Sequence, residues 1–140
     1  MFNEKNRLKY CQTAIADLKK RVYTKICDLE MTAYTTKEPV PYAKRQSGRK
    51  MKVTPGENWG QLFDCAWFHA EARLPSTADG KKVVLVIDLN GEGLVYDAAG
   101  NPFRAITNVN SEFDRRMGLP GKRIIPFSES AQAGEQIDVW

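Results

Sequence analysis

Apolar residues recur at steps of three or four along the first part of the chain. They are Leu8, Cys11, Ile15, Leu18, Val22 and Ile26. This spacing places them on one face of an α-helix. Asn3 is a suitable N-cap, and Glu4 complements the positive end of the helix dipole. The pattern predicts an amphipathic helix over residues 4–27 whose apolar stripe packs against protein, either the rest of the domain or a second copy in a homo-oligomer.

The period changes to two after residue 58. In "CAWFHAEARL", residues 65–74, small and apolar positions alternate with Trp67, His69, Glu71 and Arg73, as in a half-buried strand. "KKVVLVIDL", residues 81–89, predicts a more fully buried strand. "GLVY" and "NPF" flank "DAAG" and predict a hairpin in which Gly100 takes a positive φ.

Two more strands are expected near the end of the chain. "KRIIPF", residues 122–127, predicts a strand in which Pro126 marks an edge or a bulge, and "QIDVW", residues 136–140, begins a last strand. That alternation reaches Trp140 without a turn signal, so we expect the natural polypeptide to continue. Short strands joined by turns, with no helical period between them, predict an antiparallel β-sandwich behind one N-terminal helix.

Charge divides the chain into two parts of different character. Residues 1–52 hold 13 Lys and Arg against 5 Asp and Glu, whereas residues 53–140 hold 8 against 12. Together with the periodicity, this predicts an N-terminal amphipathic helix region over 1–34 and a basic connector containing proline and glycine over 35–57, with room for one short strand. A β-sandwich follows over 58–140.

Composition indicates a globular domain in the cytoplasm. The chain has 140 residues, about one domain, and no apolar run approaches the roughly 18 residues of a membrane span. Its charged start lacks the features of a secretory signal. Cys11, Cys27 and Cys65 are odd in number and lack a CxxC spacing, so reduced, partly buried thiols are expected.

The candidate catalytic groups are few. A catalytic zinc site needs about three protein ligands, and His69 is the single histidine, so a polar strand position is its favoured interpretation. Asp88, Glu92 and Asp97 cluster as glycosidase carboxylates do, but a short hairpin offers neither a sugar-sized cleft nor burial for the acid. We therefore interpret them as strand-end and turn residues.

Two stretches are compatible with a binding function, but a structural interpretation is favoured for each. "KRQSGRKMK", residues 44–52, has five basic residues of nine and could attract phosphate, but no nucleic-acid motif accompanies it, so a solvated or docking segment is favoured. The aromatic residues of "NWGQLFDCAWF", residues 58–68, could stack on a carbohydrate; core and interface positions are favoured for them.

The order of these pieces is more specific than any one of them. Trp59 and Gly60, then Trp67 and Phe68 in a strand that ends before Pro75, then "GEGLVYDAAGNP", residues 91–102, resemble the segment ahead of the catalytic domain in α-mannosidases of glycoside hydrolase family 38. The resemblance implies a jelly-roll sandwich of the galactose-binding-like kind. It carries over no catalytic, metal-binding or cofactor-binding residue, because the family's zinc and nucleophile motifs lie in the downstream domain.

The resemblance implies an accessory domain without hydrolytic activity of its own. It would dock on and stabilise the zinc-dependent catalytic domain of the same polypeptide. The candidate residues for contact with that domain or with sugar are Trp59, Trp67, Glu92, Tyr96 and Arg104. The alternative is a free-standing carbohydrate-binding module that binds mannose-containing glycans through Trp59 and Trp67.

Overall fold

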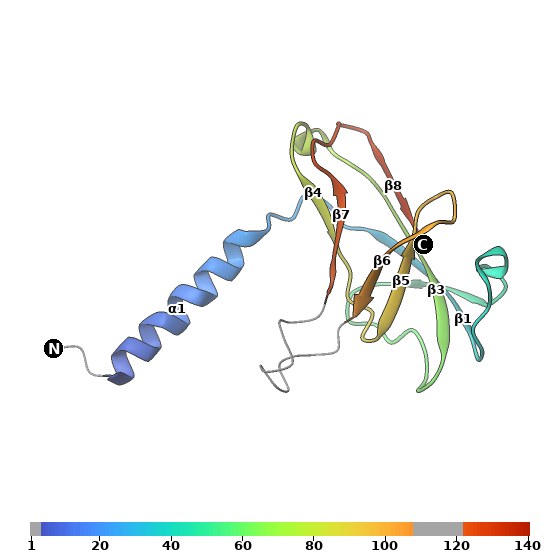
Figure 1. Ribbon diagram of the computed structural model, residues 1–140, viewed down its shortest axis with the longest axis horizontal. Helices are drawn as coiled ribbons and strands as arrows, with labels where there is room; N and C mark the ends of the chain where they lie inside the picture. Colours follow the sequence, from blue (N-terminus) through green and yellow to red (C-terminus); the bar gives the residue numbers. More distant parts are fainter. Residues whose placement is uncertain (1–3, 108–121) are drawn as a thin grey trace.

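The computed structural model describes residues 4–107 and 122–140. In these ranges the chain forms one helix, α1 (Glu4–Val22), and two short 3-10 turns, η1 (Tyr42–Lys44) and η2 (Ser76–Ala78). The strands in the same ranges are β1 (Glu30–Thr36), β2 (Arg49–Val53), β3 (Cys65–Arg73), β4 (Val83–Val86), β5 (Glu92–Tyr96), β6 (Pro102–Thr107), β7 (Ile124–Ser128) and β8 (Gln136–Val139). The chain is therefore mainly β with an N-terminal helix, as predicted (Figure 1).

The largest sheet has four antiparallel strands in the order β2-β1-β3-β8. Its register pairs Ala33 with Phe68 and Ala70 with Val139. The alternation predicted for residues 65–74 appears in the second half of β3, where Ala70 is buried while Glu71 and Arg73 are exposed. The first half of β3 is half-buried on both faces, because aromatic side chains from other segments cover it.

Two antiparallel pairs, β4 with β7 and β5 with β6, complete the β-structure of the described residues. The predicted hairpin is confirmed by β5 and β6, and Gly100 in its loop has a φ of +85°. Pro126 lies at a bulge, because Val83 pairs with Ser128 and Val84 with Pro126, which leaves Phe127 unpaired in the register. A bulge accommodates the missing N–H of proline.

One apolar core joins the four-stranded sheet to both pairs. Ile125 is the largest fully buried side chain, with 1% of its surface exposed. The cluster consists of Ala70, Leu74, Ala78, Val83, Leu85, Ile87, Val95, Ile106, Ile125, Ala131, Ile137 and Val139. Since β3, β8, β4, β5, β6 and β7 all contribute, the core lies between the layers of a sandwich. The expectation for β4 was partly wrong, because its burial alternates and Val86 is 57% exposed.

The helix is shorter than predicted. It ends at Val22 instead of residue 27, after which Ile26 and Cys27 pack against the core of the sandwich. Val22, Tyr23 and Thr24 have modest helix propensity, so burying Ile26 outweighs another helical turn. The predicted N-cap, Asn3, lies outside the described residues. In the part of the chain that is described, no helix has the length and apolar character needed to cross a membrane.

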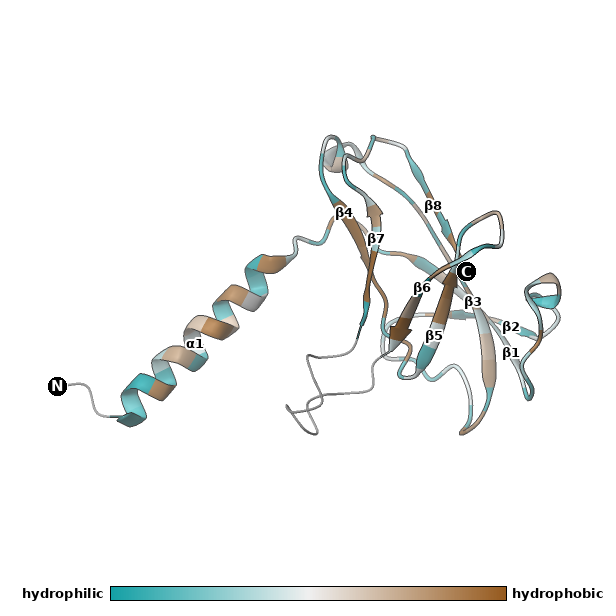
Figure 2. Cartoon of the chain, in the orientation of Figure 1, coloured by the Kyte–Doolittle hydropathy of each residue, from teal (hydrophilic) through white to brown (hydrophobic). Residues whose placement is uncertain are grey.

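The apolar stripe of α1 does not pack against the sandwich. Leu8, Ile15, Leu18 and Val22 are between 54% and 63% exposed. Figure 1 shows α1 extending away from the strands, and Figure 2 shows apolar residues along its length. The prediction that the rest of this domain covers the stripe is therefore wrong; burial by a second copy remains a prediction.

The basic segment takes part in the sheet. Residues 35–57 contain the end of β1, all of η1 and all of β2. β2 is the one short strand that the sequence allowed in this connector. In β2, Met51 and Val53 are half-buried while Lys50 and Lys52 are exposed. This alternation explains why so basic a stretch pairs with β1, and it extends the four-stranded sheet to residues before 58.

Candidate functional site

A groove of about 720 Å³ lies between β3 and β5. Phe68 and Ala70 of β3 line one side, and Leu94 of β5 lines the other. Ile87 and Ile125 contribute further apolar surface from the layer of β4 and β7. The groove therefore opens onto the core of the sandwich, and its lining favours an apolar occupant.

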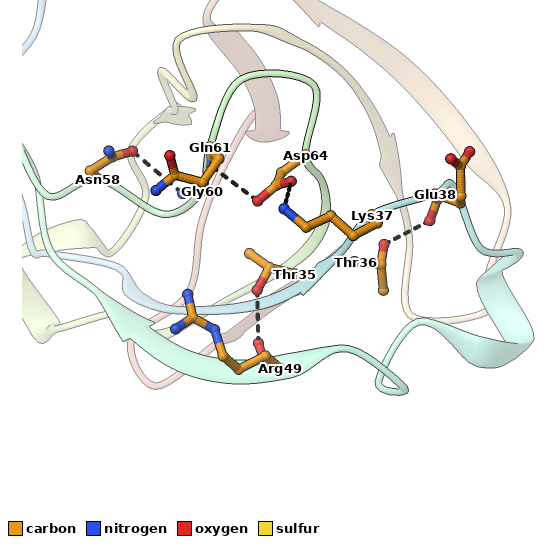
Figure 3. A network of polar contacts seen from close by, with 9 residues as sticks. All are labelled: Thr35, Thr36, Lys37, Glu38, Arg49, Asn58, Gly60, Gln61 and Asp64. Carbon is orange, nitrogen blue, oxygen red and sulfur yellow. Dashed lines mark hydrogen bonds and ion pairs between the residues drawn. The ribbon is translucent and has the colours of Figure 1, made fainter.

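The segment 58–64 borders this groove and is bonded to Lys37, the residue that follows β1. The Asp64 carboxylate accepts a hydrogen bond from Lys37 Nζ at 2.6 Å through Oδ1 and from the Gln61 amide at 3.0 Å through Oδ2 (Figure 3). The hydrogen bond from Lys37 is the main reason that the pKa of Asp64 lies below its usual value, and the Gln61 amide adds to the shift. The segment is held in place by a polar network at its base.

The tip of the same segment presents two large apolar side chains to solvent. Leu62 is 83% exposed and Phe63 is 87% exposed. Phe63 also has a φ of +67°, a left-handed conformation that is costly for a residue with a Cβ. Of the core and interface positions that the sequence favours for the aromatic residues of this stretch, the exposure of Phe63 excludes the core for that residue. An apolar pair held in a strained backbone is a typical feature of an interaction surface.

The two candidate tryptophans serve the interior of the domain. Trp59 donates from Nε1 to the Leu89 carbonyl at 3.0 Å, and its ring packs edge-on against Phe68. Trp67 donates from Nε1 to the Val40 carbonyl at 2.9 Å and packs 5.0 Å from the ring of Tyr96. Because both indole N–H groups donate within the fold, neither is free to donate a hydrogen bond to a sugar.

An aromatic cluster covers the outer face of the four-stranded sheet, and no local pattern in the sequence predicts its assembly. Tyr42 lies 5.3 Å from Tyr96 and 5.6 Å from Trp67 between ring centroids. The Arg45 guanidinium lies 4.0 Å from the Tyr42 ring centroid and 4.5 Å from that of Trp140. These cation–π contacts join the segment after β1 to the end of β8.

His69 belongs to the same face and is enclosed by charged and aromatic neighbours. Its Nε2 lies 2.9 Å from an Asp138 carboxylate oxygen, its Nδ1 lies 3.1 Å from Glu71, and its ring stacks on Trp140 at 4.1 Å. Among the described residues, no group of three or more His, Cys, Asp or Glu side chains could hold a metal ion. His69 is therefore a strand residue whose two ring nitrogens each lie next to a carboxylate.

The acidic residues around the hairpin organise its turns. Asp97 accepts the Asn101 amide at 2.8 Å across the loop, and this bond is the main reason that its pKa is lowered. The Asp88 carboxylate accepts hydrogen bonds from Arg123 and from the Asn90 amide, of which the first is the larger cause of its lowered pKa. A glycosidase acid needs a raised pKa, so neither carboxyl group suits that role.

The remaining candidates occupy different environments on the hairpin. Glu92 is exposed and lines the groove, whereas Tyr96 lies in the aromatic cluster. Arg104 pairs with the buried Val95 and is half-buried, and its Nε has no hydrogen-bond partner among the described residues. Trp67 and Tyr96 are in contact, while Trp59 lies with Phe68. Four of the candidates, Trp59, Trp67, Glu92 and Tyr96, thus line the groove, whereas Arg104 does not, and they do not converge on one reactive centre.

Of the three cysteines, Cys65 lines the groove, whereas Cys11 and Cys27 do not. All three are free thiols: Cys11 is exposed, and Cys27 and Cys65 are half-buried. The expectation of partial burial holds for two of them and is wrong for Cys11, because α1 leaves the sandwich and exposes all but one of its characterised side chains.

Sequence reasoning missed the residues that distinguish this surface. Leu62 and Phe63 stand next to each other between polar residues in a segment without periodicity, and this was the signal for an exposed apolar pair. Arg45 and Trp140 had no comparable signal, because their contact joins segments about a hundred residues apart.

Fold and site together define a jelly-roll β-sandwich with an open groove and exposed apolar residues. The family described as "Alpha-mannosidase, jelly roll domain" matches residues 26–140, and the chain belongs to this family. Alpha-mannosidase 2C1 of Mus musculus is 26% identical over 91 residues, which are 65% of this chain and 9% of that protein. The matched region thus spans about a tenth of that relative. No solved structure matches the chain.

Proposed function

We propose that this chain is the non-catalytic N-terminal domain of an α-mannosidase of glycoside hydrolase family 38. It docks on a downstream zinc-dependent catalytic domain of the same polypeptide and stabilises it. The family membership of residues 26–140 supports the class of the parent enzyme. The relative Alpha-mannosidase 2C1 supports it too, since the match covers 9% of that protein and leaves most of the length for other parts.

The observation that carries the docking proposal is the tip at Leu62 and Phe63. Both side chains are more than 80% exposed, although the segment is fastened at its base by Asp64 and Lys37. Burying a leucine or phenylalanine side chain contributes about 1.5–3 kcal/mol. A fixed tip that carries two of them loses little conformational freedom on association, so a large part of that free energy is available to hold a second domain.

The apolar stripe of α1 provides a second surface for the same partner. Leu8, Ile15, Leu18 and Val22 remain exposed in this chain. The opposite side of the helix is basic, so α1 has one apolar and one charged side. We propose that the catalytic domain covers this stripe. Zinc belongs to that catalytic domain, and the parent enzyme acts on α-mannosides in the cytoplasm.

The test replaces both apolar side chains at the tip in the parent enzyme. The double variant Leu62→Ser and Phe63→Ser is compared with Gln132→Ser, an exposed change far along the chain. If the tip docks, the double variant lowers the thermal midpoint of the enzyme by several degrees relative to Gln132→Ser and accelerates loss of activity on warming.

The kinetic constants distinguish docking from a role in hydrolysis. For an aryl α-mannoside at low temperature, kcat and KM of the double variant are expected to stay within about twofold of the wild type, a change of less than about half a kcal/mol in the barrier. Thermal midpoints equal to that of Gln132→Ser would refute docking through this tip. A large loss of kcat in a fully folded enzyme would instead place the tip at the catalytic site.

A further inference from the structure

The groove between β3 and β5 is bounded by two strand edges. β3 pairs with β1 from Cys65 to Glu71, but on its other side β8 covers it only from Ala70 to Arg73. β5 pairs with β6 along one side. Among the described residues, no strand pairs with the free edge of β3 before Ala70 or with the free edge of β5 before Tyr96.

The end of β8 lies between these two edges. Val139 pairs with Ala70 of β3 on one side. Trp140 exchanges two backbone hydrogen bonds with Tyr96 of β5 on the other, with the Tyr96 amide donating at 2.7 Å and the Trp140 amide at 3.1 Å. Alternate residues of a strand direct their amides to opposite neighbours. The end of β8 thus lies between β3 and β5, with Val139 paired to one and Trp140 bonded to the other, and Figure 1 shows the C terminus between them.

The backbone alternation tells which groups remain available in the groove. Leu74 exchanges hydrogen bonds with the segment that leads into β8, so even-numbered residues of β3 face that edge. Ala66 and Phe68 therefore direct their N–H and C=O groups into the groove. On β5, Tyr96 faces the same space, so Leu94 and Glu92 do as well. All four of these residues line the groove.

We propose that this groove binds one further β-strand, formed by the segment of the polypeptide that follows Trp140. The inference rests on the proposed function, because the occupant is the segment that leads to the catalytic domain. The strand continues β8, antiparallel to β3 and β5, and joins the four-stranded sheet to the β5–β6 hairpin. It fills a length of about five residues, roughly 17 Å at 3.4 Å per residue.

The register specifies the chemistry of the occupant. Ile137 and Val139 face the core, so the first and third residues after Trp140 face it too, over Ile87 and Ile125. These positions take branched apolar side chains. The second residue lies on the outer face, where the rings of Trp67 and Tyr96 already meet at 5.0 Å, and so it must be small.

The experiment appends two short test strands to the 140-residue chain. One extension, Val-Thr-Val-Thr-Val, places valine toward the core, and the matched control, Thr-Val-Thr-Val-Thr, has the opposite register with nearly the same composition. A shift of one residue turns every side chain to the other face of a sheet. Only the first extension is therefore expected to fit the groove.

Amide hydrogen exchange reads the outcome at individual residues. With the first extension, exchange at Phe68 and Leu94 slows by at least about tenfold relative to the control extension. Trp67 and Val95, whose amides face β1 and β6, serve as internal references. Equal exchange at Phe68 and Leu94 with both extensions overturns the proposal.

A second outcome concerns the origin of the strand. If the 140-residue chain alone forms a dimer in which Phe68 and Leu94 are already protected, a strand from a second copy occupies the groove, and the intramolecular proposal is wrong. Both measurements use the 140-residue chain or its extensions, with no catalytic domain attached. Failure of strand addition therefore leaves the docking test unaffected, and failure of docking leaves strand addition unaffected.

Discussion

Gly100 offers a direct test of whether the hairpin loop is packed scaffold or a free binding loop. It has a φ of +85°, and a Cβ at this position would lie 2.7 Å from Cε1 of Tyr42. Tyr42 is itself packed against Trp67, Tyr96 and Arg45. Its ring therefore cannot move away without disturbing the aromatic cluster, and Gly100→Ala is expected to destabilise the domain.

Gly56 provides a matched control with a similar positive φ. Its φ is +90°, and a Cβ there would meet nothing within 4 Å. A left-handed conformation costs an alanine about 1–2 kcal/mol, offset in part by the about 0.4–1 kcal/mol gained when alanine replaces glycine in the unfolded chain. Gly56→Ala should therefore lower the free energy of unfolding by only about 1 kcal/mol.

The difference between the two variants isolates the contact with Tyr42. Overpacking a filled site costs about 1–3 kcal/mol, so Gly100→Ala should lose about 2–4 kcal/mol in total. Urea unfolding followed by tryptophan fluorescence measures both variants, provided that their m values agree with the wild type. Equal losses for Gly56→Ala and Gly100→Ala would refute the packing of this loop against the cluster.

Three further predictions concern the base of the apolar tip, the core and the helix. The pKa of Asp64 is lowered in the fold by Lys37, so its contribution to stability is present above the unfolded value, about 3.9, and is lost as the pH falls through the folded pKa. Acid titrations of stability should show a steeper loss for the wild type than for Asp64→Asn below about pH 4, and parallel curves would contradict the network at the tip. Ile125→Ala, at a side chain 1% exposed, should cost about 2–5 kcal/mol, whereas Leu18→Ala, at one 63% exposed, should change the unfolding free energy of this chain by less than about half a kcal/mol. A loss of 2 kcal/mol or more for Leu18→Ala, on the scale of a buried leucine, would mean that a partner or second copy already covers the stripe.

The local pattern of the sequence determined most elements of the fold. Alternation predicted β3, the hairpin of β5 and β6 and the last strand, because the side chains of a strand point to opposite faces regardless of its partner. Pro126 predicted a bulge for the same kind of local reason, since proline lacks an amide for the ladder. The order of short motifs also indicated the family that matches residues 26–140.

Tertiary structure decided how these elements meet. The apolar period of α1 continued to Ile26, yet the helix ends at Val22 because Ile26 packs on the core, a contact that periodicity does not encode. The contact between Arg45 and Trp140 and the fastening of the tip by Lys37 and Asp64 depend on the pairing of distant segments. The groove has the same origin: two strand edges become a site only when the register of β8 places Trp140 between them.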